Sequence, residues 1–499
     1  MIILSVALVI ASMIVVGLLV ARRVAGDSRN FLVAGRTLAL PVVAATLMGQ
    51  AVDTNATLGA TDQAARLGFW AGATLPLGLA LCLLLTGLFF ARPMNRMGLT
   101  TLPDFFRLRY GRATEMAAAL LMIAAFAILV AGNLVAGGFL FEMFLGTPYV
   151  VGVLIIVAAV LVYTLAGGIL SDAYSSIVQV AVTTLASLAL LFWVAATFGL
   201  GHEPGMGPLD LGQLSDPAQG AVVNWATLAA LGVGDIVAID FMQRVFSARS
   251  PDVARRACFL AAAGTAIVGV PFALAAVATG RGLLTLLDEA APVGLSVLVL
   301  AGIVSASLST ADGAILGTAA VAVRNVGTIR RTKGPDRTTG PDDMARPGRA
   351  DRPNRADPLL RATRWAMLPV VGGSVLLALR VPQTGVLLTL AFDLMLACLA
   401  VPFVLGMFWR RGCARAALAA LSVGLVVRLT LFALTPTMYG ADNTLLYVPN
   451  TLVGAAFDGW PTFIALAASL LTYALVALIG PPAGIRGLDL RVEETPADR

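Results

Sequence analysis

The chain has 499 residues, of which 59% are hydrophobic and only 12% are charged, and its formal net charge is +6. Soluble domains carry roughly 25% charged residues, so a chain with about half that share could not cover its surface in water. Apolar runs of about 20 residues, long enough to cross a ~30 Å hydrocarbon layer, recur along the sequence. The composition therefore excludes a water-soluble protein and predicts an integral membrane protein.

The apolar runs predict an all-α polytopic membrane protein with about thirteen transmembrane helices. The first run is not a secretory signal, because no basic residue precedes it, no cleavage site follows it, and Arg22 and Arg23 stand at its end. We interpret residues 1–21 as an extra N-terminal transmembrane helix. The predicted spans are residues 2–20, 38–64, 68–90, 114–143, 148–166, 173–198, 223–246, 257–279, 293–323, 364–380, 384–408, 414–434 and 460–480.

The basic residues predict the orientation of these helices. If the N-terminus lies outside, the predicted cytoplasmic segments hold all but four of the 34 Lys and Arg residues, the exceptions being Arg66, Arg281, Arg380 and Arg428. An excess of Lys and Arg is typical of cytoplasmic loops. The sequence thus predicts an external N-terminus and a cytoplasmic C-terminus, and its Ala-, Arg- and Gly-rich composition is typical of a bacterial inner membrane protein.

Three segments are expected outside the membrane. Residues 325–360 are rich in Pro, Gly, Arg and Asp, which predicts a disordered cytoplasmic loop. Its basic excess could contact anionic lipid, but the interspersed acids favour a solvated linker. Residues 200–222 are expected to form an external loop, and residues 483–499 a cytoplasmic tail, with no soluble catalytic domain attached.

Cysteine and histidine usage argues against a metal site or an intramembrane enzyme. The four cysteines stand alone in or beside apolar runs, without a CxxC pair, and are interpreted as small core residues. The one histidine, His202, lies in a polar loop, so neither a two-histidine zinc site nor a Ser-His nucleophile system is expected.

Acidic residues interrupt two of the predicted spans. Asp53, Thr54 and Asn55 lie between glycines in the second span, and Asp235 and Asp240 follow two glycines in the seventh. An ionisable side chain at the centre of a spanning helix costs ~2.5–3.5 kcal/mol. Glycines and hydroxyl residues alone could merely let helices pack closely. The carboxylates favour broken helices that bind a solute or an ion.

The ninth span contains the stretch SASLSTADG, residues 305–313. Ala306, Ser309 and Thr310 follow the i, i+3, i+4 spacing, so they share one helix face. Two hydroxyls and a released carbonyl on that face supply oxygen ligands for a hard cation without adding charge. This spacing favours a bound monovalent cation.

Six local patterns, in the same order, resemble those of the sodium/solute symporter family, which includes bacterial proline, pantothenate and sugar transporters. The resemblance covers about residues 30–430. The patterns are FLVAGRTL from Phe31, TLPDFFRLRYG from Thr101, YTLAGGI from Tyr163 with SSIVQ from Ser175, QRVFSARS from Gln243, LSTADG from Leu308, and GMFWRR from Gly406.

The resemblance implies a 5+5 inverted repeat whose first and sixth core helices are discontinuous. These helices would be residues 38–64 and 223–246. The ten-helix core would span residues 38–408, with repeats 38–198 and 223–408, and residues 409–482 would hold two further C-terminal helices.

The resemblance also implies a site for a transported sodium ion. Its ligands would be carbonyls of Gly49 and Val52, the carbonyl of Ala306, and the hydroxyls of Ser309 and Thr310. Where the family often has an aspartate, this chain has Ser176, so a second sodium ion is not expected. Asp172, one helical turn earlier, is a candidate coupling group, although a carboxylate at a helix start is the favoured interpretation.

We therefore expect a secondary transporter that couples sodium to the symport of a small organic solute by alternating access. Asp53 and Asp235 are acids beside the two breaks, and no Arg or Lys is expected near either break within its span. A cationic or zwitterionic solute is therefore favoured. The candidate solute-binding residues are Asp53, Thr54, Asn55, Asp235 and Asp240, and the candidate coupling or proton-carrying residues are Asp53, Asp235 and Asp172.

Other functions remain open at this stage. A proton-coupled transporter of the same fold and a transporter-like solute sensor are the alternatives, although a sensor usually carries a signalling domain. A channel lacks the tight coupling site. The expected partners are a small-molecule solute and membrane lipid, with no nucleic acid and no obligate protein partner.

Overall fold

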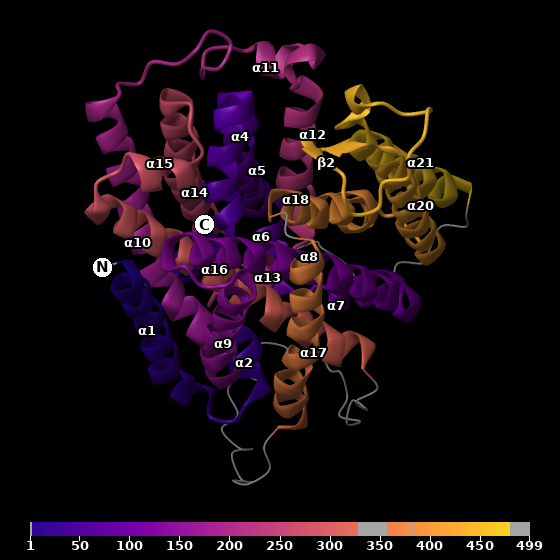
Figure 1. Ribbon diagram of the computed structural model, residues 1–499. Coiled ribbons are helices and arrows are strands. Elements are labelled where there is room, and N and C mark those ends of the chain that lie inside the picture. The colour runs from indigo at the N-terminus through magenta and orange to yellow at the C-terminus, as the bar shows by residue number, and fades with distance from the viewer. Residues whose placement is uncertain (1, 328–356, 382–383, 480–499) are drawn as a thin grey trace, which may run out of the picture.

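The computed structural model describes residues 2–327, 357–381 and 384–479, which fold almost entirely into helices (Figure 1). The predicted tail 483–499 and most of the predicted loop 325–360 lie outside the described residues. Eight long helices are unbroken: α1 (Ile2–Ala21), α8 (Arg112–Leu145), α9 (Tyr149–Gly167), α10 (Ile169–Thr197), α14 (Pro251–Thr279), α17 (Pro358–Arg380), α20 (Ala414–Leu434) and α21 (Trp460–Ile479).

Three more spans are helices that contain one π-helical turn. The turn lies between two α-helical parts in two of them and at the C-terminal end in the third. They are α5 (Phe69–Leu85) with η4 (Thr86–Phe90) and α6 (Ala91–Arg96), α16 (Val293–Val321) with η7 (Ala322–Val326), and α18 (Thr384–Met395) with η9 (Leu396–Ala400) and α19 (Val401–Phe408).

Two spans are broken, and they are the two whose sequence predicted it. The second predicted span divides into α3 (Leu40–Ala51), η3 (Asn55–Gly59) and α4 (Ala60–Leu67), and the seventh into α12 (Ala221–Gly232), η6 (Gly234–Val237) and α13 (Ile239–Ser247). The second pair of helices is bent by 48°. Among the described residues, eleven helices are long and apolar enough to cross a membrane, or twelve with this bent pair. Together with the divided α3–α4 span, they correspond to the thirteen predicted spans.

Local backbone geometry explains both breaks. After Ala51 the chain leaves the helix at Val52 (φ −88°, ψ 71°), and the Asp53 carboxylate then accepts the backbone N–H of Ala56 at 2.9 Å. This is the bond by which a helix N-cap satisfies a free donor. The second break lies at Ala238, whose backbone is extended (φ −67°, ψ 128°).

Short elements connect the spans. They are η1 (Arg22–Val24), α2 (Ser28–Val33), η2 (Ala34–Arg36), α7 (Pro103–Tyr110), α11 (Gly212–Ser215), η5 (Pro217–Gln219), α15 (Leu283–Glu289), η10 (Ala455–Phe457), and the antiparallel strands β1 (Thr437–Met438) and β2 (Ala441–Asp442). The two-residue strands form a hairpin between α20 and α21 that the sequence analysis did not predict.

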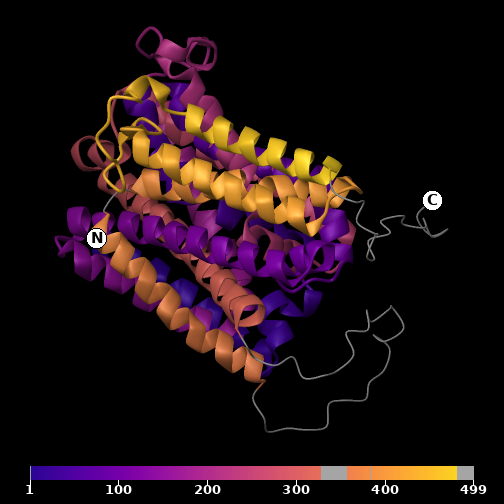
Figure 2. The same ribbon diagram turned by 90° about the vertical axis from the view of Figure 1, so that its right-hand side faces the viewer.

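Helix α16 forms the centre of the bundle, since all its residues from 299 to 321 are buried, and it packs on α10, α8, α1, α17 and α9. Helix α1 covers α10 and α9 at the periphery (Figure 1). Helices α20 and α21 run side by side along another flank (Figure 2). The oxygen-rich stretch 305–313 is therefore enclosed by other helices on all sides.

Candidate functional site

The break after α3 faces the middle of α16. The Thr310 hydroxyl lies 3.5 Å from the Gln50 carbonyl oxygen, and the Gln50 side-chain amide donates to the Ser309 carbonyl at 2.7 Å. Ala306 and Ser309 are fully buried. The structure thus brings together the two segments from which the sequence predicted ligands for a cation.

Helix α10 forms a third wall of this region, which the sequence analysis did not predict. The hydroxyls of Ser176 and Ser309 lie 3.1 Å apart, and the Gln179 side-chain amide donates to the Val52 carbonyl at 3.4 Å. A methyl group on Gly49 would come within 2.5 Å of the Gln179 side-chain oxygen. Only glycine at this position lets α3 approach α10 so closely.

A buried ion pair lies next to this wall. Arg244 Nη2 is 2.6 Å from Asp172 Oδ2, and both side chains are 0% exposed. The Thr46 hydroxyl donates to Asp172 at 2.9 Å and accepts from Arg244 Nε at 3.1 Å. The Gln50 amide also donates to Asp172, at 3.2 Å.

This arrangement corrects one prediction and extends another. Arg244 was assigned to a cytoplasmic segment, and no Arg or Lys was expected near either break within its span. Helix α13 continues to Ser247, so Arg244 is buried within the second broken span. Asp172 lies in the first turn of α10, at the helix start as the favoured interpretation had it, but its carboxylate is also held in an ion pair.

The five predicted solute-binding residues have different surroundings. Thr54 donates from its hydroxyl to Asn133 of α8 at 2.9 Å, while Asp53 caps the chain after the first break. The side chain of Asn55 lies outside the described part of the structure. Asp235 is 1% exposed, and its Oδ1 atom has no hydrogen-bond partner among the described residues. Asp240 accepts the backbone N–H of Phe241 at 2.7 Å.

The carboxylates of Asp53 and Asp240 lie close enough to Asp235 for their negative charges to disfavour a negative charge on it. The acids of the two breaks are therefore near neighbours in the fold. The positive charge of Arg244 favours the charged form of the Asp240 carboxyl, and Arg244 also donates to the main-chain carbonyl of Asp240 at 2.8 Å. Of the predicted acids, Asp235 has the carboxylate with most capacity to accept a further donor, because the Asp172 carboxylate is paired with a guanidinium, the Asp240 carboxylate accepts the Phe241 N–H, and Asp53 caps a helix.

Asp312 and Asp393 are further buried acids that were not predicted as site residues. Asp312, two residues after Thr310, accepts from the Thr164 hydroxyl of α9 at 2.6 Å. Asp393 of α18 pairs with Arg428 of α20. This buried pair explains why Arg428 departs from the orientation rule, since its charge is neutralised inside the bundle.

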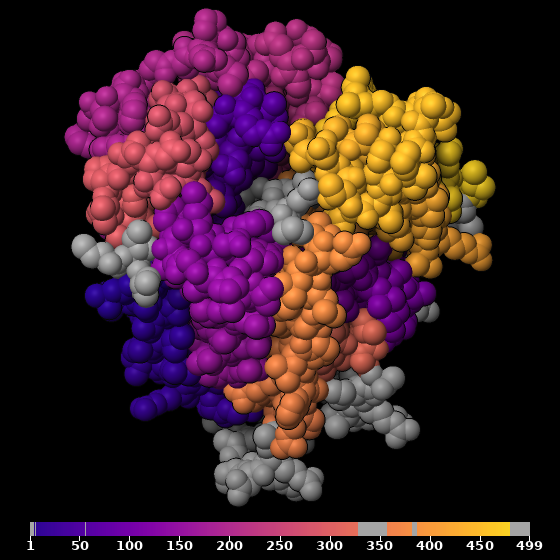
Figure 3. All heavy atoms as spheres, in the orientation of Figure 1, coloured from indigo at the N-terminus to yellow at the C-terminus, as the bar shows by residue number. Residues whose placement is uncertain are grey.

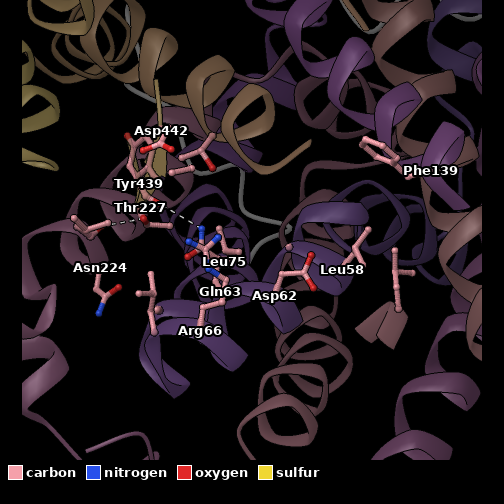
Figure 4. A pocket seen from close by; sticks show the side chains of 18 residues that line it. Leu58, Asp62, Gln63, Arg66, Leu75, Phe139, Asn224, Thr227, Tyr439 and Asp442 are labelled. Carbon is pink, nitrogen blue, oxygen red and sulfur yellow. Dashed lines mark hydrogen bonds between the residues drawn. The ribbon is translucent and has the colours of Figure 1, made fainter. Parts of the chain in front are cut away.

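A cavity of about 480 Å³ opens at the end of the bundle that carries α4, the start of α12 and the β1–β2 hairpin (Figure 4). Its wall includes Leu58 and Gly59 just beyond the first break and Thr227 of α12. The Gln63 side chain of α4 donates to the Tyr439 carbonyl of the hairpin at 3.2 Å. A hollow between α4 and the segment that contains the hairpin is visible on the surface (Figure 3).

The opposite end of the broken helices is closed by hydrogen bonds. Leu38, just before α3, and Ala248, just after α13, form a parallel bridge, in which the Leu38 N–H donates to the Ser247 carbonyl at 3.1 Å. The Asn95 side chain donates to the carbonyls of Val245 and Ala248 at 2.8 and 3.0 Å. The cavity therefore lies at one end of the broken helices, and hydrogen bonds close their other end.

Comparison with known proteins shows which proteins this chain is similar to. The human high affinity choline transporter 1 is 27% identical over 342 residues, which cover 60% of this chain and 56% of that protein. The osmoregulated proline transporter OpuE of Bacillus subtilis (strain 168) is 33% identical over 140 residues, 27% of this chain and 28% of OpuE. The chain thus matches about half, or less, of the length of these curated relatives.

A solved structure of a Na+-coupled sialic acid symporter, in a substrate-bound outward-open state, superposes on 97% of this chain with a TM-score of 0.73 at 15% identity, covering 98% of that chain. This likeness confirms the predicted fold class. The model of the sodium:solute symporter family matches residues 31–333. The family and the relatives found are transporters, in agreement with the prediction that the chain is not an enzyme. The chain belongs to the sodium:solute symporter family.

Proposed function

We propose that this protein is a secondary active transporter that couples the inward movement of sodium to the symport of a small organic solute by alternating access. The observation that carries the proposal is the contact between the broken end of α3 and the hydroxyl face of α16, where Thr310 meets the Gln50 carbonyl. The sodium ion is a transported substrate here.

The cation would lie between α3 and α16. Its ligands would be the carbonyl oxygens of Gly49, Val52 and Ala306 and the hydroxyls of Ser309 and Thr310. All five are neutral oxygens, which suit a hard monovalent cation whose single charge needs no carboxylate. Because Val52 has left the helix, its carbonyl is released from the regular helical ladder and is available to a ligand.

Coupling requires that the solute site and the ion site share a moving element. Asp53, next to Val52 in the break, belongs to both the proposed ion segment and the proposed solute segment. Ordering the break by sodium would therefore also order the solute site. A membrane potential of about 100 mV supplies ~2.3 kcal/mol per charge, and a tenfold sodium gradient adds ~1.4 kcal/mol, which together sustain roughly 500-fold accumulation.

We propose a cationic or zwitterionic solute, because one carboxylate oxygen of Asp235, near the two breaks, has no hydrogen-bond partner among the described residues. A protonated amine would donate a hydrogen bond to that oxygen, and a quaternary ammonium group would be attracted to its charge. The relatives named for choline, a cation, and for proline, a zwitterion, support this class. Asp235 also supports the second candidate function, proton-coupled transport, since a free carboxylate can carry a proton.

The proposed orientation has the N-terminus outside and the C-terminus in the cytoplasm of a bacterial inner membrane. In this orientation the cavity opens to the outside and the Leu38–Ala248 seal lies on the cytoplasmic side. The described conformation would then be the one that receives sodium and solute from outside.

The experiment is a thermal-stability titration of the purified protein with NaCl, with KCl at equal ionic strength as the reference. The Ser309→Ala/Thr310→Ala variant is compared with Thr363→Ala/Ser374→Ala, which removes two equally buried hydroxyls from α17. Ligand that binds only the folded state stabilises it by about 2.7 kcal/mol at 100 times its Kd. We expect a sodium-specific rise in Tm for the wild type and the α17 variant and none for the Ser309/Thr310 variant. The absence of a sodium effect in the wild type would refute sodium coupling.

A further inference from the structure

The side chain of Gln50 joins the proposed ion site to the buried ion pair. Its amide nitrogen donates to the Ser309 carbonyl at 2.7 Å and to Asp172 Oδ1 at 3.2 Å. A side-chain amide has two N–H donors, so one group can hold both acceptors at once. The main-chain carbonyl of the same residue faces Thr310. Any shift of α3 relative to α16 therefore also moves a donor to Asp172.

Asp172 passes this link to α13. Its other oxygen is 2.6 Å from the Arg244 guanidinium, and the Thr46 hydroxyl bonds to both partners. The space for this arrangement comes from Gly313, where a methyl group would lie 2.4 Å from Arg244 Nη2 and 2.5 Å from Gln50 Oε1. The final glycine of the SASLSTADG stretch thus admits two side chains of other helices.

Arg244 stands beside the closed end of the molecule. Its neighbour Gln243 donates from its side chain to the Leu32 carbonyl of α2 at 2.6 Å, and the bridge from Leu38 to Ala248 follows directly after α13. The second broken span is therefore fastened at this end to the chain that leads into the first.

A buried ion pair is weak support for stability, because desolvating two charges can cost more than their attraction returns. Well-packed apolar residues would fill the same space without that cost. The pair is instead placed where α3, α10 and α13 meet, and Asp172 accepts from Gln50 of α3 while it pairs with Arg244 of α13.

From this geometry we infer that Gln50, Thr46, Asp172 and Arg244 form a relay that transmits occupation of the ion site to the inner seal. A cation between α3 and α16 fixes the Gln50 backbone and the Ser309 carbonyl. The Gln50 amide then holds Asp172 against Arg244, and Arg244 fixes α13, whose neighbouring residues Gln243 and Ala248 contact the segment 28–38. The four side chains are positioning residues, and the inference rests on the proposed sodium site.

The test uses the full-length protein and hydrogen–deuterium exchange of the segments 28–38 and 239–250, measured in NaCl and in KCl. Gln50→Met keeps the length of the side chain and removes its amide, and Thr46→Val removes the hydroxyl shared by the ion pair. The matched controls are Gln213→Met in the segment 200–220 and Thr265→Val in α14, a buried threonine whose hydroxyl has no partner among the described residues.

We expect sodium to slow exchange in both segments of the wild type and of the two controls. In Gln50→Met the sodium concentration for half of this effect should rise tenfold or more, and in Thr46→Val the slowing in segment 239–250 should be lost. A purely structural role would speed exchange equally in both salts, leaving the difference between NaCl and KCl unchanged.

The outcomes separate the two proposals. If the wild type shows no difference between sodium and potassium, the sodium site itself is wrong. If the wild type responds and both variants respond at the same concentration, the relay is wrong while the site stands. Thr46→Val makes the smaller change in shape, so it decides the matter if Gln50→Met does not fold.

Discussion

Neutralising Asp235 tests what this buried carboxylate does. Asp235→Asn keeps the size of the side chain and removes its charge. The residue is 1% exposed, one of its oxygens has no hydrogen-bond partner in the described residues, and the charges of Asp53 and Asp240 act on it. Without solute, then, this carboxylate is desolvated beside like charges.

The change has opposite effects on stability and on solute binding. A hydrogen bond to a charged group contributes about 1.5–3 kcal/mol, and each 1.4 kcal/mol changes affinity about tenfold, so an amine-bearing solute should bind roughly 10- to 150-fold more weakly. The solute-free protein should become more stable, because a buried charge near like charges is removed. If the Asp235 carboxylate binds the solute, its removal should therefore raise the stability of the solute-free protein and weaken solute binding.

The assay is the Tm of purified protein in NaCl, titrated with choline and with proline, the solutes for which the relatives are named. Asp288→Asn, an exposed acid on α15, makes the same change of charge away from the breaks. We expect Asp235→Asn to raise the starting Tm and to shift the solute titration to higher concentration, with Asp288→Asn unchanged. A variant that binds whichever solute the wild type binds with unchanged affinity, or whose solute-free Tm falls, would refute the reasoning.

Two further changes test packing around the ion pairs. Gly313→Ala places a methyl group 2.4 Å from Arg244, and overpacking of this kind costs about 1–3 kcal/mol. We expect the Tm of this variant to fall and the backbone amides of the segments 28–38 and 239–250 to exchange faster. Gly294→Ala, where the added methyl group meets open space, should match the wild type in both measurements. Arg428→Met leaves Asp393 as an unpaired buried charge and should lower the free energy of unfolding by about 3–5 kcal/mol, seen as a lower Tm. The double variant Asp393→Leu/Arg428→Met should recover most of this lost stability. A double variant as unstable as the single one would contradict this account.

The helices and their two breaks could be predicted because each has a local cause. A run of about 20 apolar residues must span the membrane as a helix, since no other segment satisfies its own backbone in hydrocarbon. Asp53 and Asp235 within such runs are costly enough to mark an interruption. The hairpin of Thr437–Met438 and Ala441–Asp442 lacked any such signal, since its strands have only two residues each.

The polar contacts between helices could not be predicted in the same way. Ser309 and Thr310 were found because their spacing places them on one face of a single helix. Gln50, Ser176 and Gln179 became part of the site only through the register of α3 and α10 against α16, which no local pattern encodes. Ser176 and Gln179 lie in the SSIVQ pattern, three residues apart on one helix face, and that spacing was the available signal.

The ion pair also bears on the choice between sodium and proton coupling. To accept a proton, Asp172 would have to release the Arg244 guanidinium in a fully buried position, and breaking such a pair costs about 3–5 kcal/mol. Asp172 is therefore a poor proton carrier, and the buried acid of the two breaks with an oxygen that has no partner in the described parts of the chain is Asp235. If proton coupling holds, uptake by Asp235→Asn should lose its pH dependence, whereas a sodium symporter should keep its response to NaCl in this variant at a higher solute concentration. The two mechanisms thus make opposite predictions for one substitution, because Asp172 is held in an ion pair, whereas Asp235 keeps an oxygen with no partner among the residues that the structure describes.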